Sequence, residues 1–196
     1  MTDPRARSRW AGVPAADRRV ERRALLIDAA FDLLGTEGLS GTTVRAVCQA
    51  AQLNPRYFYE SFDDLDALVV AVYDRLTVEL RVEIEKAVAK ASTGDDVVRA
   101  TVASTVRFID SDRRRGRVLY VEALGNEALN RRRIEASFAV ADLIAAGSRD
   151  VSRQLAAAFV VGGFSEVLMA WLDGRIKVSR TRLIDQTTDL FLAIGR

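Results

Sequence analysis

The stretch Thr42–Phe62, TTVRAVCQAAQLNPRYFYESF, determines how the first part of this chain folds. Its opening threonines can cap a helix that extends to about Ala50, because a threonine oxygen accepts a hydrogen bond from a first-turn N–H. Residues 51–53 then form a turn. Asn54 is a second capping residue, and Pro55 suits the first helical position, where a missing N–H is tolerated. Two short helices around a tight turn are therefore predicted.

Such a pair is typical of a helix-turn-helix, in which the first helix braces a second one in the DNA major groove. The predicted inner surface is Ala46, Val47, Ala50, Leu53 and Phe58. Arg56 in the first turn is expected to reach base edges, because an arginine–guanine pair is the commonest specific contact. The full set of predicted DNA-binding residues is Arg22, Thr42, Thr43, Arg45, Asn54, Pro55, Arg56, Tyr57 and Tyr59. The spacing alone also fits a plain helical hairpin.

The run from about Arg22 to Tyr73 resembles the TetR family of transcriptional regulators. The matching segments are Ala29-Ala30-Phe31, Gly35 with Gly38, Thr42-Thr43-Val44, Ala50-Ala51-Gln52-Leu53 and the run YFYESFDDLDAL at 57–68. The resemblance implies an all-α regulator whose C-terminal domain dimerises and encloses a small-molecule pocket. Three positions depart from the family pattern. Gln52 and Arg56 stand where glycine is common, and Leu65 stands where a phosphate-binding lysine is common.

The whole chain is predicted to be all-α, because strand patterns are absent and proline is rare after the first residues. About nine helices are expected: 17–35, 42–50, 54–61, 63–91, 95–110, 114–122, 126–147, 151–174 and 180–195. The predicted domains are a flexible basic arm over 1–17, a helix-turn-helix DNA-binding domain over 18–63, and a ligand-binding and dimerisation domain over 64–196. The arm and the residues after it carry seven arginines up to Arg23, which suits phosphate contacts or a solvated tail equally.

Composition excludes several kinds of site. The chain has 196 residues, no histidine and one cysteine, Cys48, so histidine-based catalysis, histidine metal sites and cysteine-rich zinc sites are excluded. We expect no enzyme activity, no cofactor and no metal. The single cysteine favours a reducing compartment, and no apolar run is expected to span a membrane, so a cytoplasmic location is predicted.

The segment 156–172, AAAFVVGGFSEVLMAWL, is apolar on almost all sides, so it is expected to be buried. Its central Gly-Gly pair suits close approach of another helix. We predict a two-fold dimer interface formed with the last helix and consisting of Phe159, Gly162, Gly163, Val167, Leu183, Thr187, Leu190 and Phe191. The alternative is that both helices fill the core of a monomer.

A ligand pocket is the second expectation for the C-terminal part. The candidate residues are Phe108, Tyr120, Glu122, Phe138, Glu166 and Trp171. Aromatic residues at helical spacing also fit ordinary core packing, and Glu166 also fits an ion pair or an interface rim. The arginine runs 113–115 and 131–133 are interpreted as solvated surfaces.

Together these features predict a ligand-responsive transcriptional regulator, most simply a repressor. Its partners would be a palindromic double-stranded DNA operator, a small-molecule effector and a second copy of the chain. The two reading helices of the homodimer would sit about 34–36 Å apart in successive major grooves. The alternative is a non-regulatory helical module that binds small molecules or proteins.

Overall fold

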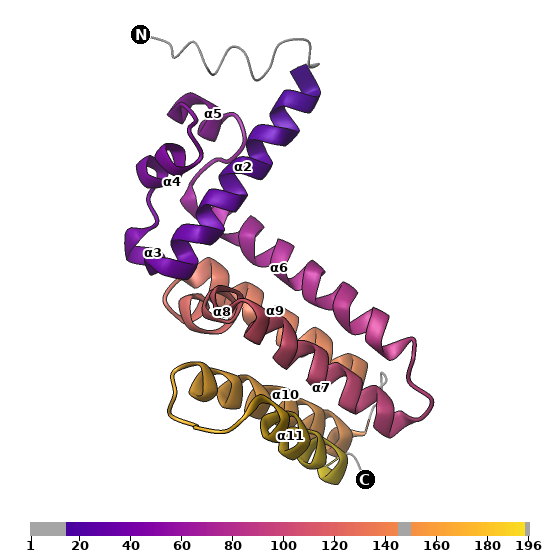
Figure 1. Ribbon diagram of the computed structural model, residues 1–196. Helices are drawn as coiled ribbons and strands as arrows, with labels where there is room; N and C mark the ends of the chain where they lie inside the picture. Colours follow the sequence, from indigo (N-terminus) through magenta and orange to yellow (C-terminus); the bar gives the residue numbers. More distant parts are fainter. Residues whose placement is uncertain (1–14, 145–149, 195–196) are drawn as a thin grey trace.

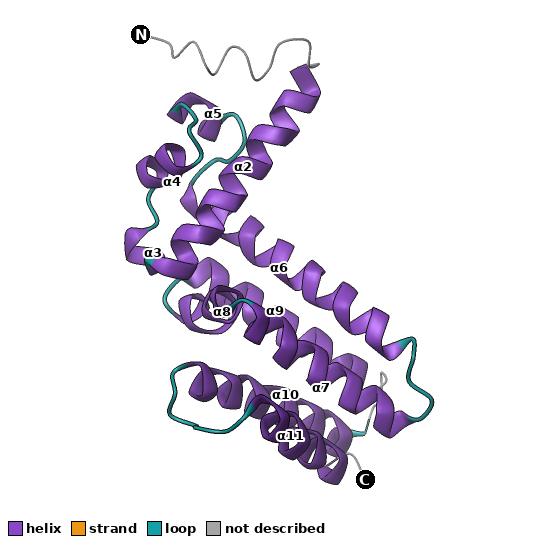
Figure 2. Cartoon of the chain, viewed as in Figure 1, coloured by secondary structure: helices purple, strands orange, loops and turns teal. Residues whose placement is uncertain are grey.

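The structure is a computed structural model that describes residues 15–144 and 150–194. Within these ranges the chain contains helices and loops but no strand, which confirms the all-α prediction (Figures 1 and 2). The elements in chain order are α2 Ala15–Thr36, α3 Gly38–Gly41, α4 Val44–Ala50, α5 Pro55–Tyr59, α6 Leu65–Val88, α7 Gly94–Ser111, α8 Arg113–Gly116, η1 Arg117–Val121, η2 Glu122–Leu124, α9 Glu127–Ile144, α10 Val151–Leu172 and α11 Arg180–Ile194.

Local capping chemistry explains where the N-terminal helices begin. Thr43 caps α4 by accepting a hydrogen bond from the Ala46 N–H, and Asn54 caps α5 by accepting one from the Arg56 N–H. Asp64 caps the long helix α6 in the same way through the Ala67 N–H. Because each cap satisfies an amide that the helix itself leaves unpaired, these three starting points match the sequence prediction.

Two apolar clusters hold the molecule together. The first joins α2, α4, α5 and α6 and continues into η1 and α9 through Val118, Leu119 and Leu129. It therefore crosses the predicted domain boundary at residue 64, which remains a prediction. The second cluster joins α7, α10 and α11, with Trp171 and Leu183 among its buried members. Tyr120 packs against both.

The arrangement places the short helices at one end of the molecule. Figure 1 shows α2 to α5 gathered there, while α6 leads from them along the bundle formed by α7, α9, α10 and α11. Helix α6 packs against α2, α7 and α9. A shift of α6 would therefore displace packing contacts both with α2 at this end of the molecule and with α7 and α9 in the bundle.

The segment predicted as one helix over 114–122 differs from the expectation. It is divided into α8, the π-helical turn η1 and the 3-10 turn η2. Insertions of π-helical turns are often found at functional sites. Here the break brings the side chains of Arg117 and Glu122 together beside the end of α2.

Helix α10 also departs from the sequence expectation. By length and composition alone it could cross a membrane, with only 28% of its most apolar window buried. In the structure it packs against α9, α11, α8 and η1. Its buried residues include Val160, Val161 and Leu168. We therefore interpret it as a bundle helix that leaves one apolar face uncovered.

Candidate nucleic-acid interface

Helices α4 and α5 meet through a tight turn at Gln52. Its φ of 55° makes it the only non-glycine residue with a positive φ in the described ranges. The Leu53 N–H donates to the Cys48 carbonyl at 2.9 Å, which closes the turn. The position where the TetR pattern usually has glycine thus keeps the left-handed geometry that favours glycine, although a side chain is present.

The inner surface of the pair is small and apolar, as predicted, but its membership differs. Val47 and Phe58 are fully buried, whereas Ala50 is exposed. Cys48 and Ala51 are buried in its place. Burial raises the pKa of the Cys48 thiol, so the only cysteine is a core residue that resists ionisation.

The outer surface is formed mainly by the first turn of α5. Asn54, Pro55 and Arg56 are exposed, and the side chain of Arg56 is 82% accessible. Its Nε donates to Glu60 Oε1 at 3.0 Å along the helix. Tyr59 is 63% exposed on the same short helix. This geometry leaves the Arg56 guanidinium at the surface, where it can exchange a weak intrahelical pair for a base or phosphate contact.

Thr43 and Arg45, at the start of α4, are also exposed. They flank the first turn of that helix, where free amide groups favour anions. The side-chain oxygen of Thr43 already accepts the Ala46 N–H as the α4 cap. A DNA contact at this position would therefore involve backbone amides at the start of α4 as well as the threonine side chain.

Thr42 does not belong to this surface. It is 1% exposed, its hydroxyl donates to the Gly38 carbonyl at 2.8 Å, and its N–H donates to the Leu39 carbonyl at 3.1 Å. The sequence placed it among the DNA contacts, but the structure uses both of its donors to close the α3 turn.

Arg22 is likewise drawn inward. Its side chain is 14% exposed, it pairs with Glu60 at 3.4 Å, and its guanidinium lies 4.2 Å from the centre of the half-buried Tyr57 ring. Arg23 repeats the arrangement one residue later, 4.1 Å from the centre of the Phe62 ring. These arginines fasten α2 to α5 and to the residues just after it, and sequence reasoning missed this role because their partners lie 38 residues away.

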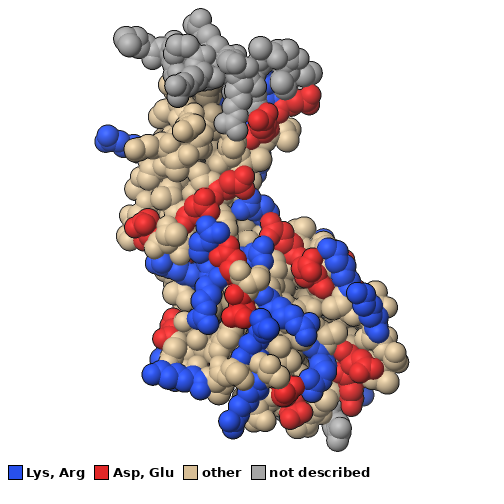
Figure 3. Space-filling view, in the orientation of Figure 1, with Lys and Arg blue, Asp and Glu red and all other residues tan. Residues whose placement is uncertain are grey.

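Charge on the visible face is unevenly distributed. Figure 3 shows mostly uncharged surface over the N-terminal helices, while blue and red are closely mixed below them. Most of the predicted basic arm, residues 1–14, lies outside the described residues. Of the arginines predicted to contact DNA, Arg45 and Arg56 are the exposed ones in the described chain.

A polar contact joins this end of the molecule to the rest. Glu122 Oε2 accepts the Leu39 N–H at 2.8 Å, and Glu122 Oε1 accepts Arg117 Nε at 2.8 Å. Arg117 also donates to the Gly35 and Thr36 carbonyls at the end of α2, at 3.3 and 2.8 Å. Glu122, predicted as a pocket residue, is thus a link to the corner between α2 and α3, which it reaches because of the break at η1.

Further ion pairs and hydrogen bonds run along the same boundary. Arg114 donates to Asp32 at 2.8 Å and packs on Phe31. Arg75 on α6 pairs with Asp28 on α2. The arginine run 113–115, predicted as a solvated surface, is therefore partly occupied in holding α2.

The C-terminal helices contain two cavities of similar size. One, of about 710 Å³, lies between α6 and α7, and the other, of about 720 Å³, lies among α7, α10 and α11. Of the predicted pocket residues, Phe108 lines the first. Tyr120 and Trp171 belong to the apolar clusters, and burial raises the pKa of Tyr120. Phe138 is 60% exposed and Glu166 faces solvent, so neither lines a cavity in the described chain.

The predicted dimer residues divide into two groups. Phe159, Gly162, Gly163 and Leu190 are exposed, with Phe159 at 72% and Leu190 at 59%. Val167 and Phe191 are partly buried. Leu183 and Thr187 are buried at 3% and 5% exposure within the single chain, because α11 turns this face toward α7. The last two cannot form an interface without unpacking the monomer.

No cluster of three or more metal-ligating side chains occurs among the described residues.

Comparisons with known proteins agree with this geometry. The family model for bacterial regulatory proteins of the tetR family matches residues 26–72, which contain α4, α5 and the start of α6. A Haemophilus influenzae protein named as an uncharacterized HTH-type transcriptional regulator is 33% identical over 116 residues. That match covers 59% of this chain and 56% of the relative, so it spans little more than half of the relative's length.

Solved structures share the fold across nearly the whole chain. One is a proposed transcriptional regulator from Pseudomonas aeruginosa, with a TM-score of 0.75 and 18% identity over 95% of this chain and 94% of the other. Another is the regulator FadR from Bacillus subtilis in complex with stearoyl-CoA, with a TM-score of 0.72 and 14% identity over 87% and 97% of the two chains. The N-terminal helix-turn-helix region, residues 26–72, thus matches the tetR family of bacterial regulatory proteins, and the fold of nearly the whole chain is similar to that of solved regulators.

Proposed function

We propose that this protein is a ligand-responsive transcriptional regulator that binds a palindromic DNA operator as a homodimer and represses transcription. The observation that carries the proposal is the exposed first turn of α5, where Asn54, Pro55 and Arg56 project from a braced, buried helix pair. A rigid support is what base reading requires, because a small displacement of the contacting side chain removes its hydrogen bonds. The match of residues 26–72 to the tetR family model supports the same function.

The uncovered face of α10 supports the dimer. Leu155, Phe159, Gly162 and Glu166 follow one another at helical spacing and are all exposed. A Cβ added at Gly162 or Gly163 would meet no atom within 4 Å in the single chain. An exposed apolar face with glycines at its centre suits the close approach of the same face of a second copy. Leu190 on α11 would extend this surface.

The effector is proposed to be a small organic molecule held among the C-terminal helices. The FadR relative was solved in complex with stearoyl-CoA, and this chain has two cavities of a size suited to a small ligand. The effect of ligand binding would be transmitted to the DNA-binding helices through α6 and through the Arg117–Glu122 ion pair. The ligand would have to bind the two states of the protein with different affinity. A cytoplasmic location and the lack of enzyme activity follow from this role.

Selection of binding sites from random double-stranded DNA tests the proposal. We expect recovery of a palindrome whose half-sites lie about 34–36 Å apart, which corresponds to one DNA turn. Selection with an Arg56→Ala variant should recover a site with relaxed preference at one base of each half. If the full chain enriched no sequence, the regulatory role would be wrong and a non-regulatory binding module would replace it.

A further inference from the structure

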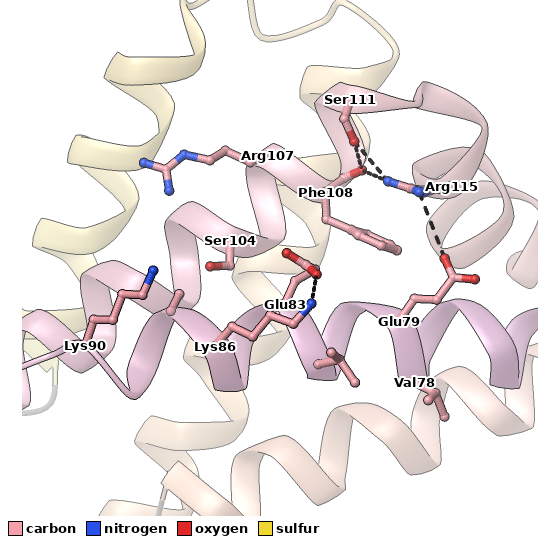
Figure 4. Close-up of a pocket in the computed structure, with 12 residues that line it drawn as sticks. Val78, Glu79, Glu83, Lys86, Lys90, Ser104, Arg107, Phe108, Ser111 and Arg115 are labelled. Atoms are coloured by element: carbon pink, nitrogen blue, oxygen red, sulfur yellow. Dashed lines mark hydrogen bonds and ion pairs between the residues drawn. The ribbon is translucent and has the colours of Figure 1, made fainter.

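The cavity between α6 and α7 has one apolar end and one polar end. These two helices pack side by side, and the cavity measures about 710 Å³. Val78, Val82 and Phe108 supply apolar lining. Figure 4 shows Lys90, Ser104 and Arg107 at one end of the groove, with Val78 toward the other. From Ala87 to Val78 the groove follows α6 for about 14 Å, at 1.5 Å per residue, and Lys90 lies just beyond the end of that helix.

Ser104 carries the strongest indication that the groove takes a polar ligand. Its residue is only 7% exposed, yet its hydroxyl has no hydrogen-bond partner in the described chain. Two threonines on the same helix behave differently, since Thr101 and Thr105 donate to the carbonyls four residues earlier at 2.9 and 3.0 Å. The Ser104 oxygen is not among the buried unpaired side-chain atoms of the described chain, so it opens into the groove that it lines. A ligand in the groove would supply the missing acceptor.

The acidic side chains that line the groove are paired, whereas two basic side chains at the Ser104 end are not paired within the described chain. Glu83 is paired with Lys86 at 2.9 Å, and Glu79 lies 3.6 Å from Arg75 and 4.0 Å from Arg115. Both acids of the lining are thus engaged.

Lys90 and Arg107 also line the groove, and neither has an acidic partner among the residues that the structure describes. In Figure 4 their charged ends lie on the same side as the Ser104 hydroxyl. Two unpaired cations beside an unpaired hydroxyl that opens into the groove suit a negatively charged head group.

We propose that this groove binds an amphipathic anion. Its carboxylate or phosphate head lies against Lys90, Ser104 and Arg107, and its apolar body lies along Val78, Val82 and Phe108. Binding of the anion does not depend on the proposed function. Only the further step does, in which the same anion acts as effector and changes the affinity for the operator. Occupancy would press on α6, which packs directly on α2.

The test measures binding by calorimetry to the full chain without DNA. The probes are decanoate, decyl phosphate, the neutral decanol and the cationic decyltrimethylammonium. We expect one of the two anions to bind with an affinity at least about tenfold higher than decanol, and the cation to bind most weakly, because a charge-assisted contact is roughly twice as strong as a neutral one. Comparison of the two anions identifies the preferred head group.

Variants locate the site. The double change Lys90→Gln with Arg107→Gln should lower affinity for the preferred anion by about tenfold or more. Ser104→Ala should lower it by a smaller factor. Arg81→Gln is the matched control, since Arg81 lies on α6, is 67% exposed and pairs with Glu85 outside the groove. Circular dichroism checks that each variant keeps its fold.

Equal binding of decanol and both anions would overturn the proposal, as would undiminished anion binding by the double variant. A separate titration of the operator in the presence of the anion distinguishes anion binding in the groove from the effector role. Binding that depends on Lys90 and Arg107 without any change in operator affinity would leave the groove assignment standing and remove the effector role.

Discussion

Arg117 and Glu122 form a 2.8 Å ion pair across the break between η1 and η2, and both side chains also bind the corner between α2 and α3. Arg117 binds two carbonyls at the end of α2, while Glu122 binds the amide of Leu39 in α3. One pair therefore satisfies backbone groups that the two helix ends leave free. It is one of several polar connections between the DNA-reading end and the helices that follow, beside Arg114–Asp32 and Arg75–Asp28.

Glu122→Gln tests the strength of this connection. The change keeps the shape but replaces a carboxylate that is 12% exposed by a neutral amide. We expect a loss of about 1.5–3 kcal/mol in the free energy of unfolding, the usual value of a hydrogen bond to a charged group. Glu127→Gln is the control, because Glu127 is 91% exposed and its pair with Arg131 should contribute little. Urea denaturation measures both. Equal midpoints for the two variants would contradict the role.

Gly38→Ala probes the same corner through the backbone. Gly38 has a φ of +74°, and a Cβ there would lie 2.8 Å from Arg117 Nη2 and 2.9 Å from Glu122 Oε1. Gly174 has nearly the same φ, +73°, but open space around it. Gly174→Ala should therefore cost only the backbone strain, about 1–2 kcal/mol. Gly38→Ala should cost a further ~1–3 kcal/mol from crowding. Thermal unfolding of both variants gives the difference, and similar losses would mean that the Arg117–Glu122 pair moves aside freely.

Arg56 and Arg22 share Glu60 as a partner, yet we expect opposite effects from removing them. Arg56→Ala should weaken operator binding by about 1–3 kcal/mol. Its stability should change by less than ~0.5 kcal/mol, because the side chain is 82% exposed. Arg22→Ala should instead lower the free energy of unfolding by roughly 1–3 kcal/mol, since it removes the buried brace on Tyr57. Operator titration and urea denaturation of each variant check this. If Arg56→Ala lowered the free energy of unfolding and Arg22→Ala did not, the roles assigned to the two arginines would be reversed.

These residues also show how far the sequence could predict the structure. Thr43 and Asn54 cap amides within three residues and Pro55 occupies the first turn of α5, so the local pattern is enough to place the starts of α4 and α5. The roles of Arg22 and Glu122 depend on partners 38 and 83 residues away. No local pattern contains that information, because the partner is chosen by how distant helices pack.

The C-terminal half shows the same limit in its apolar residues. Leu183 and Phe159 were predicted together as interface residues, but one is 3% and the other 72% exposed. Helical spacing identifies which residues share a face. It does not reveal whether that face meets the same chain, as Leu183 does, or is left open, as Phe159 is.

Tyr73 should make stability sensitive to alkaline pH. It is 4% exposed, and burial raises its pKa to about 12, against about 10 for a free tyrosine. Between these values the unfolded chain loses the phenolic proton before the folded one, so stability falls as pH rises. The loss should reach about 1.4 kcal/mol at pH 11. Tyr73→Phe should show a shallower decline in urea midpoint from pH 8 to 11. The same slope in both proteins would place the pKa of Tyr73 near its ordinary value.

Phe159→Arg is the corresponding test of assembly. Phe159 is 72% exposed at the centre of the uncovered α10 face, beside Gly162, so a charged side chain there would be buried without a partner in the proposed dimer. We expect sedimentation to show a monomer, together with a large loss of affinity for a palindrome but not for a single half-site, because only the dimer engages two half-sites at once. Phe138→Arg is the matched control, since Phe138 is also exposed, at 60%, but lies on α9 outside the proposed interface. If Phe138→Arg dissociated the protein and Phe159→Arg did not, the two-fold contact would belong to α9 rather than to α10 and α11.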